Sequence, residues 1–170
     1  MGPRVRRSWA PRGHTPVLMQ RGRSRVNVSV IGALVITPRH RVRAYFSLSP
    51  GASFDGERIL AFLKQLCRTV RAPIELVWDR LPAHLGQPVK AWLERNPHRI
   101  RANLLPPYAP ELNPVELMWG YAKTNCLANF APHELDELID QTHFATQLIS
   151  ADHALLKSFL RHCALCFRLK

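Results

Sequence analysis

The stretch LLPPYAPELNPVELMWGYAK, residues 104–123, joins three local signals that decide the fold. An apolar run ends at Leu105, and a group of prolines then stops it. After the prolines, Asn113 suits a helix cap, Pro114 the first helical position and Glu116 the third, which is the arrangement of a capping box. The stretch therefore predicts a strand, a stiff turn, and a helix whose first turn holds one carboxylate.

Outward from this stretch, strands and helices alternate. Alternating or continuous apolar runs predict strands, and apolar residues at helical spacing predict helices. We predict strands over 25–36, 41–49, 72–79 and 99–106, and helices over 53–70, 85–96, 114–128, 133–149 and 152–165. The order β-β-α-β-α-β-α-α-α favours a mixed α/β sheet with parallel members, flanked by helices. We expect residues 1–150 to form one domain and 151–170 a carboxyl-terminal helix.

The charge of the chain is high and unevenly distributed. The formal net charge is +12 over 170 residues, and residues 1–50 hold ten arginines and no acid. Residues 101–150 hold two basic and six acidic residues. A basic region beside an acidic one favours a polyanionic partner, with nucleic acid first. A solvated surface or a disordered arm remains the alternative.

The sequence also limits the compartment and the chemistry. No apolar run reaches the length that spans a bilayer, and the first residues lack the apolar core of a signal peptide. We therefore expect a cytoplasmic protein with reduced cysteines and no membrane contact. Cys163 and Cys166 form a lone C-x-x-C without a second ligand pair, which favours core cysteines over a zinc site.

Two carboxylates are the candidate catalytic and metal-binding groups. Asp79 ends a predicted strand, and ligand sites in open α/β sheets lie beyond the carboxyl ends of strands. Glu116 opens the helix that follows the next strand. Two acids at one rim suit Mg²⁺ or Mn²⁺, and a pair of such ions activates a nucleophile on a phosphodiester. The structural alternatives are a turn or cap role for Asp79 and a capping-box role for Glu116.

Further residues suit contact with DNA. Lys123 follows Glu116 by seven residues and shares its helix face, with Gly120 leaving room between them. We also assign phosphate contacts to alternating arginines that share one face of an extended segment: Arg21, Arg23 and Arg25. His84 either faces the metal site or a phosphate, or caps the helix that follows.

These residues carry a family resemblance. WDRLPAH (78–84), LPPYAPELNPVELMWGYAK (105–123), RRSWAPRGHTPVL (6–18) and SVIGALV (29–35) resemble the catalytic core of the IS630 branch of the IS630/Tc1/mariner DDE transposases, over about residues 4–130. The resemblance implies an RNase H-like fold and Mg²⁺- or Mn²⁺-dependent cleavage and joining of double-stranded DNA at transposon ends. Asp79 matches the second catalytic acid and Glu116 the third. Nucleoid association and homo-oligomerisation, or pairing with an upstream transposase part, follow as expectations.

One departure from the family pattern changes the expected activity. In the family, the first catalytic Asp ends a strand just before the RRSWAPRG segment, whereas this chain has no acid before Asp55. Asp55 suits a helix cap. We therefore expect the carboxyl-terminal part of a transposase, from a split frame, a decayed gene or a mis-called start. The missing first strand would lie between the 25–36 strand and the Asp79 strand, so its loss exposes two strand edges and favours oligomers.

Three functions remain open at this stage. The first is a transposase part that cleaves DNA only when the upstream part completes it. The second is an inactive remnant that binds DNA or pairs with full-length transposase. The third is a basic nucleic-acid-binding module whose acids only cap helices.

Overall fold

The computed structural model describes residues 6–7, 9–15, 17 and 27–165 of the chain. Within these residues the elements follow the predicted order and types. The strands are β1 (Val28–Ile36), β2 (Val42–Pro50), β3 (Ile74–Trp78) and β4 (Ile100–Leu104). The α-helices are α1 (Gly56–Thr69), α2 (Gln87–Arg95), α3 (Pro114–Tyr121), α4 (Leu135–Ala151) and α5 (His153–His162). Short helical turns lie at Pro82–Leu85, Pro110–Leu112 and Ala122–Cys126.

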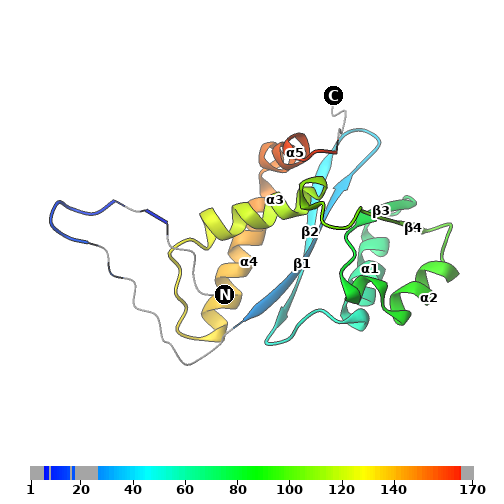
Figure 1. Ribbon diagram of the computed structural model, residues 1–170, viewed down its shortest axis with the longest axis horizontal. Coiled ribbons are helices and arrows are strands. Elements are labelled where there is room, and N and C mark those ends of the chain that lie inside the picture. Colours follow the sequence, from blue (N-terminus) through cyan, green and yellow to red (C-terminus); the bar gives the residue numbers. More distant parts are fainter. Residues whose placement is uncertain (1–5, 8, 16, 18–26, 166–170) are drawn as a thin grey trace.

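The strands form two separate pairs. β1 and β2 are an antiparallel hairpin, and β3 and β4 are a parallel pair joined through α2. Both the predicted hairpin and the predicted parallel members are thus present. Among the described residues, β1 pairs only with β2 and β3 only with β4, so the predicted single sheet is divided in two. The two pairs lie side by side, with β1 and β3 facing each other (Figure 1).

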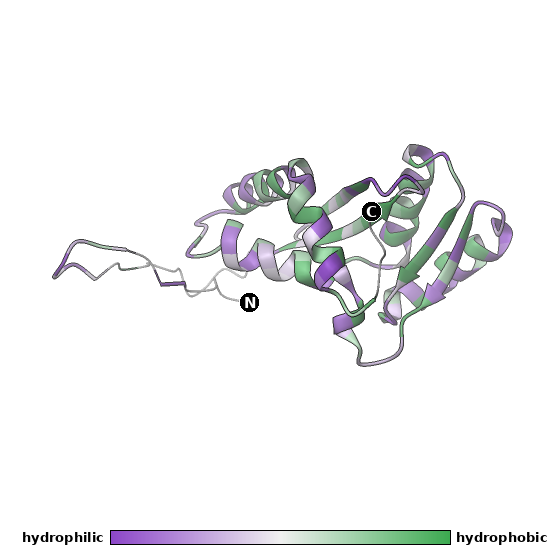
Figure 2. Cartoon of the chain, turned by 90° about the horizontal axis from the view of Figure 1, so that it is seen from above, coloured by the Kyte–Doolittle hydropathy of each residue, from purple (hydrophilic) through white to green (hydrophobic). Residues whose placement is uncertain are grey.

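Each strand pair has its own core. Helices α3, α4 and α5 cover one face of the β1–β2 hairpin, and α1 and α2 pack on the β3–β4 pair (Figure 1). The first core is centred on Met118, Ile149 and Leu156, and the second on Ile59 and Val89, all of them essentially inaccessible to solvent. The hydropathy colouring shows hydrophobic residues interspersed with hydrophilic ones along both the strands and the helices (Figure 2).

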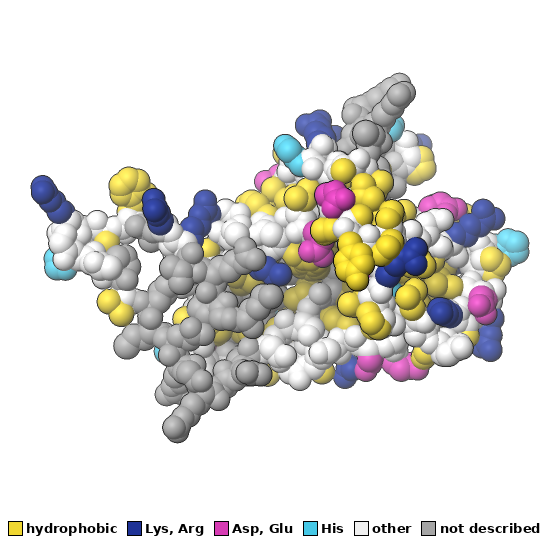
Figure 3. All heavy atoms as spheres, in the orientation of Figure 1, with side chains coloured by type: hydrophobic (Ala, Val, Ile, Leu, Met, Phe, Trp, Pro, Cys, Tyr) yellow, Lys and Arg dark blue, Asp and Glu magenta, His cyan; other side chains and the backbone are white. Residues whose placement is uncertain are grey.

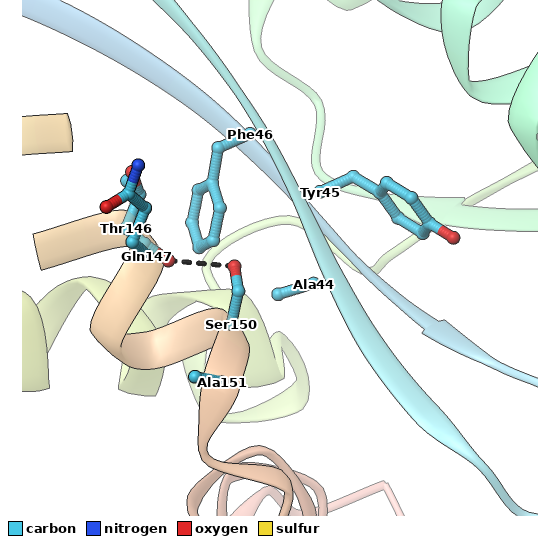
Figure 4. Close-up of a pocket in the computed structure, with 7 residues that line it drawn as sticks. All are labelled: Ala44, Tyr45, Phe46, Thr146, Gln147, Ser150 and Ala151. Atoms are coloured by element: carbon cyan, nitrogen blue, oxygen red, sulfur yellow. Dashed lines mark hydrogen bonds between the residues drawn. The ribbon is translucent and has the colours of Figure 1, made fainter. Parts of the chain in front are cut away.

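The two faces of the hairpin differ in their neighbours. On β2, Ala44 and Phe46 point toward α4, and Tyr45 points to the opposite side of the strand (Figure 4). No charged side chain among the described residues lines the shallow hollow between β2 and α4, where Ser150 Oγ donates to Thr146 O at 2.7 Å. Directly paired residues share a face, so the even-numbered residues of β1 also face α3–α5. The odd-numbered ones face α1.

Local signals explain the ends of the helices. Asp55 caps α1 by accepting a hydrogen bond from Arg58 N at 2.9 Å, which confirms its expected capping role. Asp152 caps α5 in the same way, through Leu155 N. The helix predicted over 114–128 is present, but only Pro114–Tyr121 is α-helical: a π-helical turn continues it through Cys126, with Leu127 N bonded to Ala122 O at 2.9 Å.

The remaining sequence expectations concern the ends of the chain. Arg6 anchors the described part of the amino-terminal segment, because its backbone and side chain bond Asn129, Thr124 and Asn125 near the end of α3. Helix α5 packs on α3 and β2 and contributes Phe159 to their core. None of the described helices combines the length and hydropathy needed to cross a membrane.

Candidate active site

Asp79 lies in the first position after β3, at the carboxyl end of the parallel pair. Its Oδ1 accepts a hydrogen bond from Leu81 N at 3.0 Å. Asp79 therefore stabilises the turn after β3, which is the structural role that the sequence also allowed. The side chain nevertheless remains 47% exposed. One carboxylate oxygen is thus used for local structure, and accessible surface remains for a ligand.

His84 approaches the same carboxylate. Its Nδ1 lies 2.8 Å from Asp79 Oδ1, in a close contact that lacks the alignment of a hydrogen bond. The imidazole stacks on the buried ring of Trp78, with ring centroids 4.5 Å apart and planes 9° apart. Only 13% of the His84 side chain is exposed. From the sequence, His84 could either face the metal site or a phosphate, or cap the following helix. In the structure it contacts Asp79.

The loop after β4 delivers Glu116 to the same region. Leu105 N donates to Trp78 O at 2.8 Å, which extends the β3–β4 ladder by one bond and aligns the loop with Asp79. The prolines that follow restrict the backbone, and Tyr108 has a φ of 57°, which is uncommon for a residue with a side chain. A short 3₁₀ turn at Pro110–Leu112 then leads into α3. The proline-rich stretch therefore acts as a rigid link from the end of β4 to the start of α3.

Glu116 does not form the reciprocal bond of a capping box. Asn113 caps α3 by accepting from Val115 N at 3.1 Å, as predicted. The N–H of Asn113, which a capping box would give to Glu116, instead donates to Pro110 O at 3.0 Å. In the described part of the chain no hydrogen bond or ion pair reaches the Glu116 carboxylate, and its residue is exposed. The capping alternative for this acid is therefore wrong.

Gly32 on β1 allows α3 to pack closely against the strand. A Cβ built on Gly32 would lie 3.0 Å from Met118 Cε and 3.0 Å from the ring of Trp119. The absence of a side chain thus lets α3 pack directly on the strand. Trp119 also stacks edge-on against Phe46, with ring centroids 5.8 Å apart. These contacts fix the position of the helix that carries Glu116.

Asp79 and Glu116 line one large cavity. It has a volume of about 1090 Å³ and lies between the two strand pairs, bordered by β1, α1, β3 and the start of α3. In the space-filling view, acidic side chains lie beside exposed hydrophobic ones where α3 and β3 meet (Figure 3). Asp79 and Glu116, the two acids proposed from the sequence, therefore line one cavity although they are 37 positions apart in the chain.

The two carboxylates suit a hard divalent cation only in part. Mg²⁺ prefers oxygen donors and is bound in proteins by one or two carboxylates together with waters and substrate phosphates. Asp79 and Glu116 supply that donor type, and both are accessible from the cavity. No group of three metal-ligating side chains gathers within residues 27–165 or the described amino-terminal residues. The pair fits a site that takes its remaining ligands from elsewhere.

Lys123, predicted to bind DNA, does not line this cavity. Lys123 is exposed but belongs to the π-helical turn, so the seven-residue spacing from Glu116 is not that of one continuous α-helix. Gly120 does leave open space, since nothing lies within 4 Å of a Cβ built there. Three predicted phosphate contacts lie outside the described residues: Arg21, Arg23 and Arg25.

Sequence reasoning missed other exposed groups. Arg39 and Arg41 are exposed in the turn between β1 and β2, and Arg43 is exposed near the start of β2. The alternation of Arg41 and Arg43 around Val42 was a readable signal in the sequence. Tyr108, fully exposed in the loop before α3, had no periodic signal to reveal it.

Comparison with known proteins identifies the family of the chain. Residues 1–139 match the family described as DDE superfamily endonuclease. The chain belongs to this family. A curated relative, "Uncharacterized protein y4pE/y4sA" of Sinorhizobium fredii (strain NBRC 101917 / NGR234), is 31% identical over 87 residues, which are 50% of this chain and 61% of the relative. The chain therefore matches less than two thirds of that relative's length.

Solved structures of Mos1 mariner transposase share the fold of this DDE endonuclease chain. The Mos1 mariner paired-end complex with Mn aligns with a TM-score of 0.61 at 17% identity, over 94% of this chain and 48% of that one. The Mos1 catalytic domain with raltegravir and Mg aligns with a TM-score of 0.53 at 15% identity, over 79% of this chain and 76% of that one. The chain therefore shares the α/β fold of the Mos1 catalytic domain, in agreement with the predicted RNase H-like fold.

Proposed function

We propose that this DDE endonuclease chain provides two acids of a metal-dependent transposase site, of IS630 type, that cleaves and joins DNA at transposon ends. One observation carries the proposal: Asp79 and Glu116, from different elements, line the same cavity. The family match and the fold shared with Mos1 transposase support it. The proposed partners are double-stranded DNA and further copies or parts of a transposase.

The residues have distinct roles in this proposal. Asp79 and Glu116 hold Mg²⁺ or Mn²⁺, which when bound activates the attacking oxygen and stabilises the leaving one. His84 positions Asp79: its contact with Oδ1, together with the bond from Leu81 N, fixes the rotation of the carboxylate. Exposed arginines of the hairpin, the segment of Arg21, Arg23 and Arg25, and Lys123 hold the DNA backbone. A further carboxylate from outside the described residues completes the ligand set.

Metal binding by the full chain tests the site. We expect Mn²⁺ to bind in titrations followed by electron paramagnetic resonance, and Asp79→Asn and Glu116→Gln each to weaken binding by at least about tenfold. Glu111→Gln is the matched control, because Glu111 is also exposed and lies five positions before Glu116 but does not line the cavity. Equal affinities for Glu116→Gln and Glu111→Gln would contradict the proposed metal site.

Cleavage of DNA carrying transposon ends tests the activity. We expect the 170-residue chain alone to be inactive with Mg²⁺, and activity to appear when the upstream strand and its Asp are joined to it. In the joined protein, Asp79→Ala or Glu116→Ala should abolish cleavage and leave DNA binding nearly intact. Cleavage that survives both substitutions would refute the assignment. A joined protein that binds DNA and never cleaves would support the inactive-remnant alternative.

A further inference from the structure

Tyr108 lies in the loop that joins β4 to α3, and the fold makes no use of its ring. Its side chain is 100% exposed, and among the described residues its hydroxyl forms no hydrogen bond. Its φ of 57° is a backbone conformation that glycine or asparagine adopts more readily than tyrosine. Neither packing nor backbone geometry therefore explains an aromatic residue at this position.

The loop holds Tyr108 beside the cavity of the two acids. The ends of the loop, Leu105 and Leu112, both line the cavity that Asp79 and Glu116 line. Three residues of chain span at most about 11 Å, so the Cα of Tyr108 lies within that distance of the Cα of Leu105. The prolines of the loop restrict the backbone between its ends. The ring is therefore held close to the cavity.

Arg80 adds a positive charge at the start of the same loop. It follows Asp79 directly in the chain, and its Nε donates a hydrogen bond to Leu105 O at 3.0 Å. This bond fixes the guanidinium at the base of the loop that carries Tyr108. In the described part of the chain the exposed Arg80 forms no ion pair. A guanidinium that is held in place, has no acidic partner and keeps its terminal nitrogens for a second contact suits a phosphate.

Exposed apolar side chains lie on the same part of the molecule. Three leucines that flank the acids or end β4 are each at least 39% exposed: Leu81, Leu104 and Leu117. Figure 3 shows hydrophobic, acidic and basic side chains gathered where α3 meets the β3–β4 pair. We call these three leucines, together with Arg80 and Tyr108, the loop rim. The loop rim thus combines one flat ring, one cation and an apolar surround.

A nucleotide with an unpaired base matches each part of the loop rim. Its phosphate suits the guanidinium, and its base suits the ring of Tyr108 on an apolar surround. Inside a duplex the neighbouring base pairs cover both faces of a base, so an interior base can stack on a protein ring only when it is unpaired. The span of about 11 Å between Leu105 and Tyr108 corresponds to about three nucleotides at 3.4 Å each.

A second copy of the chain suits the loop rim less well. Each copy has a formal net charge of +12, so a second copy would bring like charge toward Arg80. DNA instead brings phosphates, which attract both Arg80 and the chain as a whole. The charge therefore favours nucleic acid as the occupant.

We propose that the loop rim is a subsite for an unpaired nucleotide of the DNA substrate, in which Tyr108 stacks on the base and Arg80 binds a phosphate. The inference rests on the proposed action of Asp79 and Glu116 on DNA. It adds that the DNA at these acids has an unpaired base next to the point of cleavage. Every base has a face that can stack on an aromatic ring, so the subsite selects locally opened DNA and not a particular sequence.

The test uses the full chain in metal-free buffer and fluorescently labelled duplexes with one single-stranded end. One probe ends in three unpaired thymidines, and the other has abasic sites in their place but keeps every phosphate. We expect the thymidine probe to bind at least about fivefold more tightly, as measured by fluorescence anisotropy. Equal affinities for the two probes would overturn this inference and leave the proposed function standing. If neither probe nor a blunt duplex bound, both would be overturned.

Variants of Tyr108 separate its ring from the rest of the DNA-binding surface. Tyr108→Ala should lower the affinity for the thymidine probe to that for the abasic probe, whereas Tyr108→Phe should keep the difference because it keeps the ring. Phe144→Ala is the matched control, since Phe144 is an aromatic residue 52% exposed on α4, which packs on the hairpin. A Tyr108→Ala variant that still prefers the thymidine probe would overturn the proposal.

Arg80→Gln tests the phosphate contact. It should weaken binding of both probes alike and reduce the slope of log affinity against log salt by about one. Arg68→Gln is the control, because Arg68 is exposed in the last turn of α1, which leads to the opposite end of β3 from Asp79. Equal slopes for these two variants would refute the role of Arg80.

Photo-cross-linking locates the unpaired base on the protein. With 5-iodouracil at each unpaired position in turn, we expect a cross-link to Tyr108, identified by mass spectrometry. Trp9 is also fully exposed, so a cross-link to Trp9 and none to Tyr108 would place the base on the amino-terminal segment. Self-association of the chain that Tyr108→Ala removes would assign the loop rim to a second copy. Either result would overturn the proposal.

Discussion

Replacement of Gly32 by valine tests whether α3 is seated on β1 as described. The first added atom, a Cβ, would already lie 3.0 Å from Met118 Cε and from the Trp119 ring. The methyl groups of valine extend further into the same contact. Met118 is fully buried in the core of the hairpin, so it cannot move aside without a rearrangement of that core.

The magnitude follows from two opposing effects. Overpacking of a close-packed core costs about 1–3 kcal/mol, and this site belongs at the upper end because contact is already tight at the first atom. Valine has a higher strand propensity than glycine, which offsets at most about 1 kcal/mol. We expect a net loss of about 2 kcal/mol in unfolding free energy, which for a chain of this length lowers the melting temperature by about 4–8 °C.

The assay is calorimetry of Gly32→Val beside Ala33→Val. Ala33 is the next residue of the same strand, faces the opposite side and lines the cavity between the strand pairs, so its valine variant should melt near the wild-type temperature. The displaced α3 carries Glu116, so Gly32→Val should also weaken Mn²⁺ binding at the proposed site. If both variants melted alike, α3 would not pack on Gly32 and the reasoning would fail.

Three further outcomes are expected. DNA affinity should fall steeply as salt rises, and Lys123→Ala should reduce the slope of log affinity against log salt by about one, as a lost phosphate contact does. Asn113→Ala should lower stability by about 1 kcal/mol through loss of the cap on Val115 N, as measured by urea unfolding. Burial raises the pKa of the Cys67 thiol, against the opposing charge of Arg99, and burial likewise raises the pKa of Cys126. Iodoacetamide should therefore alkylate both more slowly than in the urea-unfolded chain, with rates still rising at pH values where an exposed cysteine has reached its plateau.

Much of the secondary structure followed from local sequence. In the described part of the chain, nine strands and helices have the predicted types and order because each has a periodic apolar pattern and local start or stop residues. The caps at Asp55 and Asn113 were predictable for the same reason, since a cap requires only a side chain and the backbone two or three residues ahead. The choice of Asp79 and Glu116 also came from local position, at the end of a strand and the start of a helix.

What the sequence determined by itself is the set of elements, their caps and the two acids, because these depend on contacts within one or two turns of chain. Only the tertiary structure shows that Asp79 and Glu116 line the same cavity. It also shows that His84 stacks on Trp78 and contacts Asp79. The close packing of α3 on Gly32 is likewise a tertiary contact. Tertiary structure also turned the end of α3 into a π-helical turn and left β1 and β3 facing each other unpaired. These features depend on packing and backbone pairing between segments distant in sequence, and no local pattern encodes them.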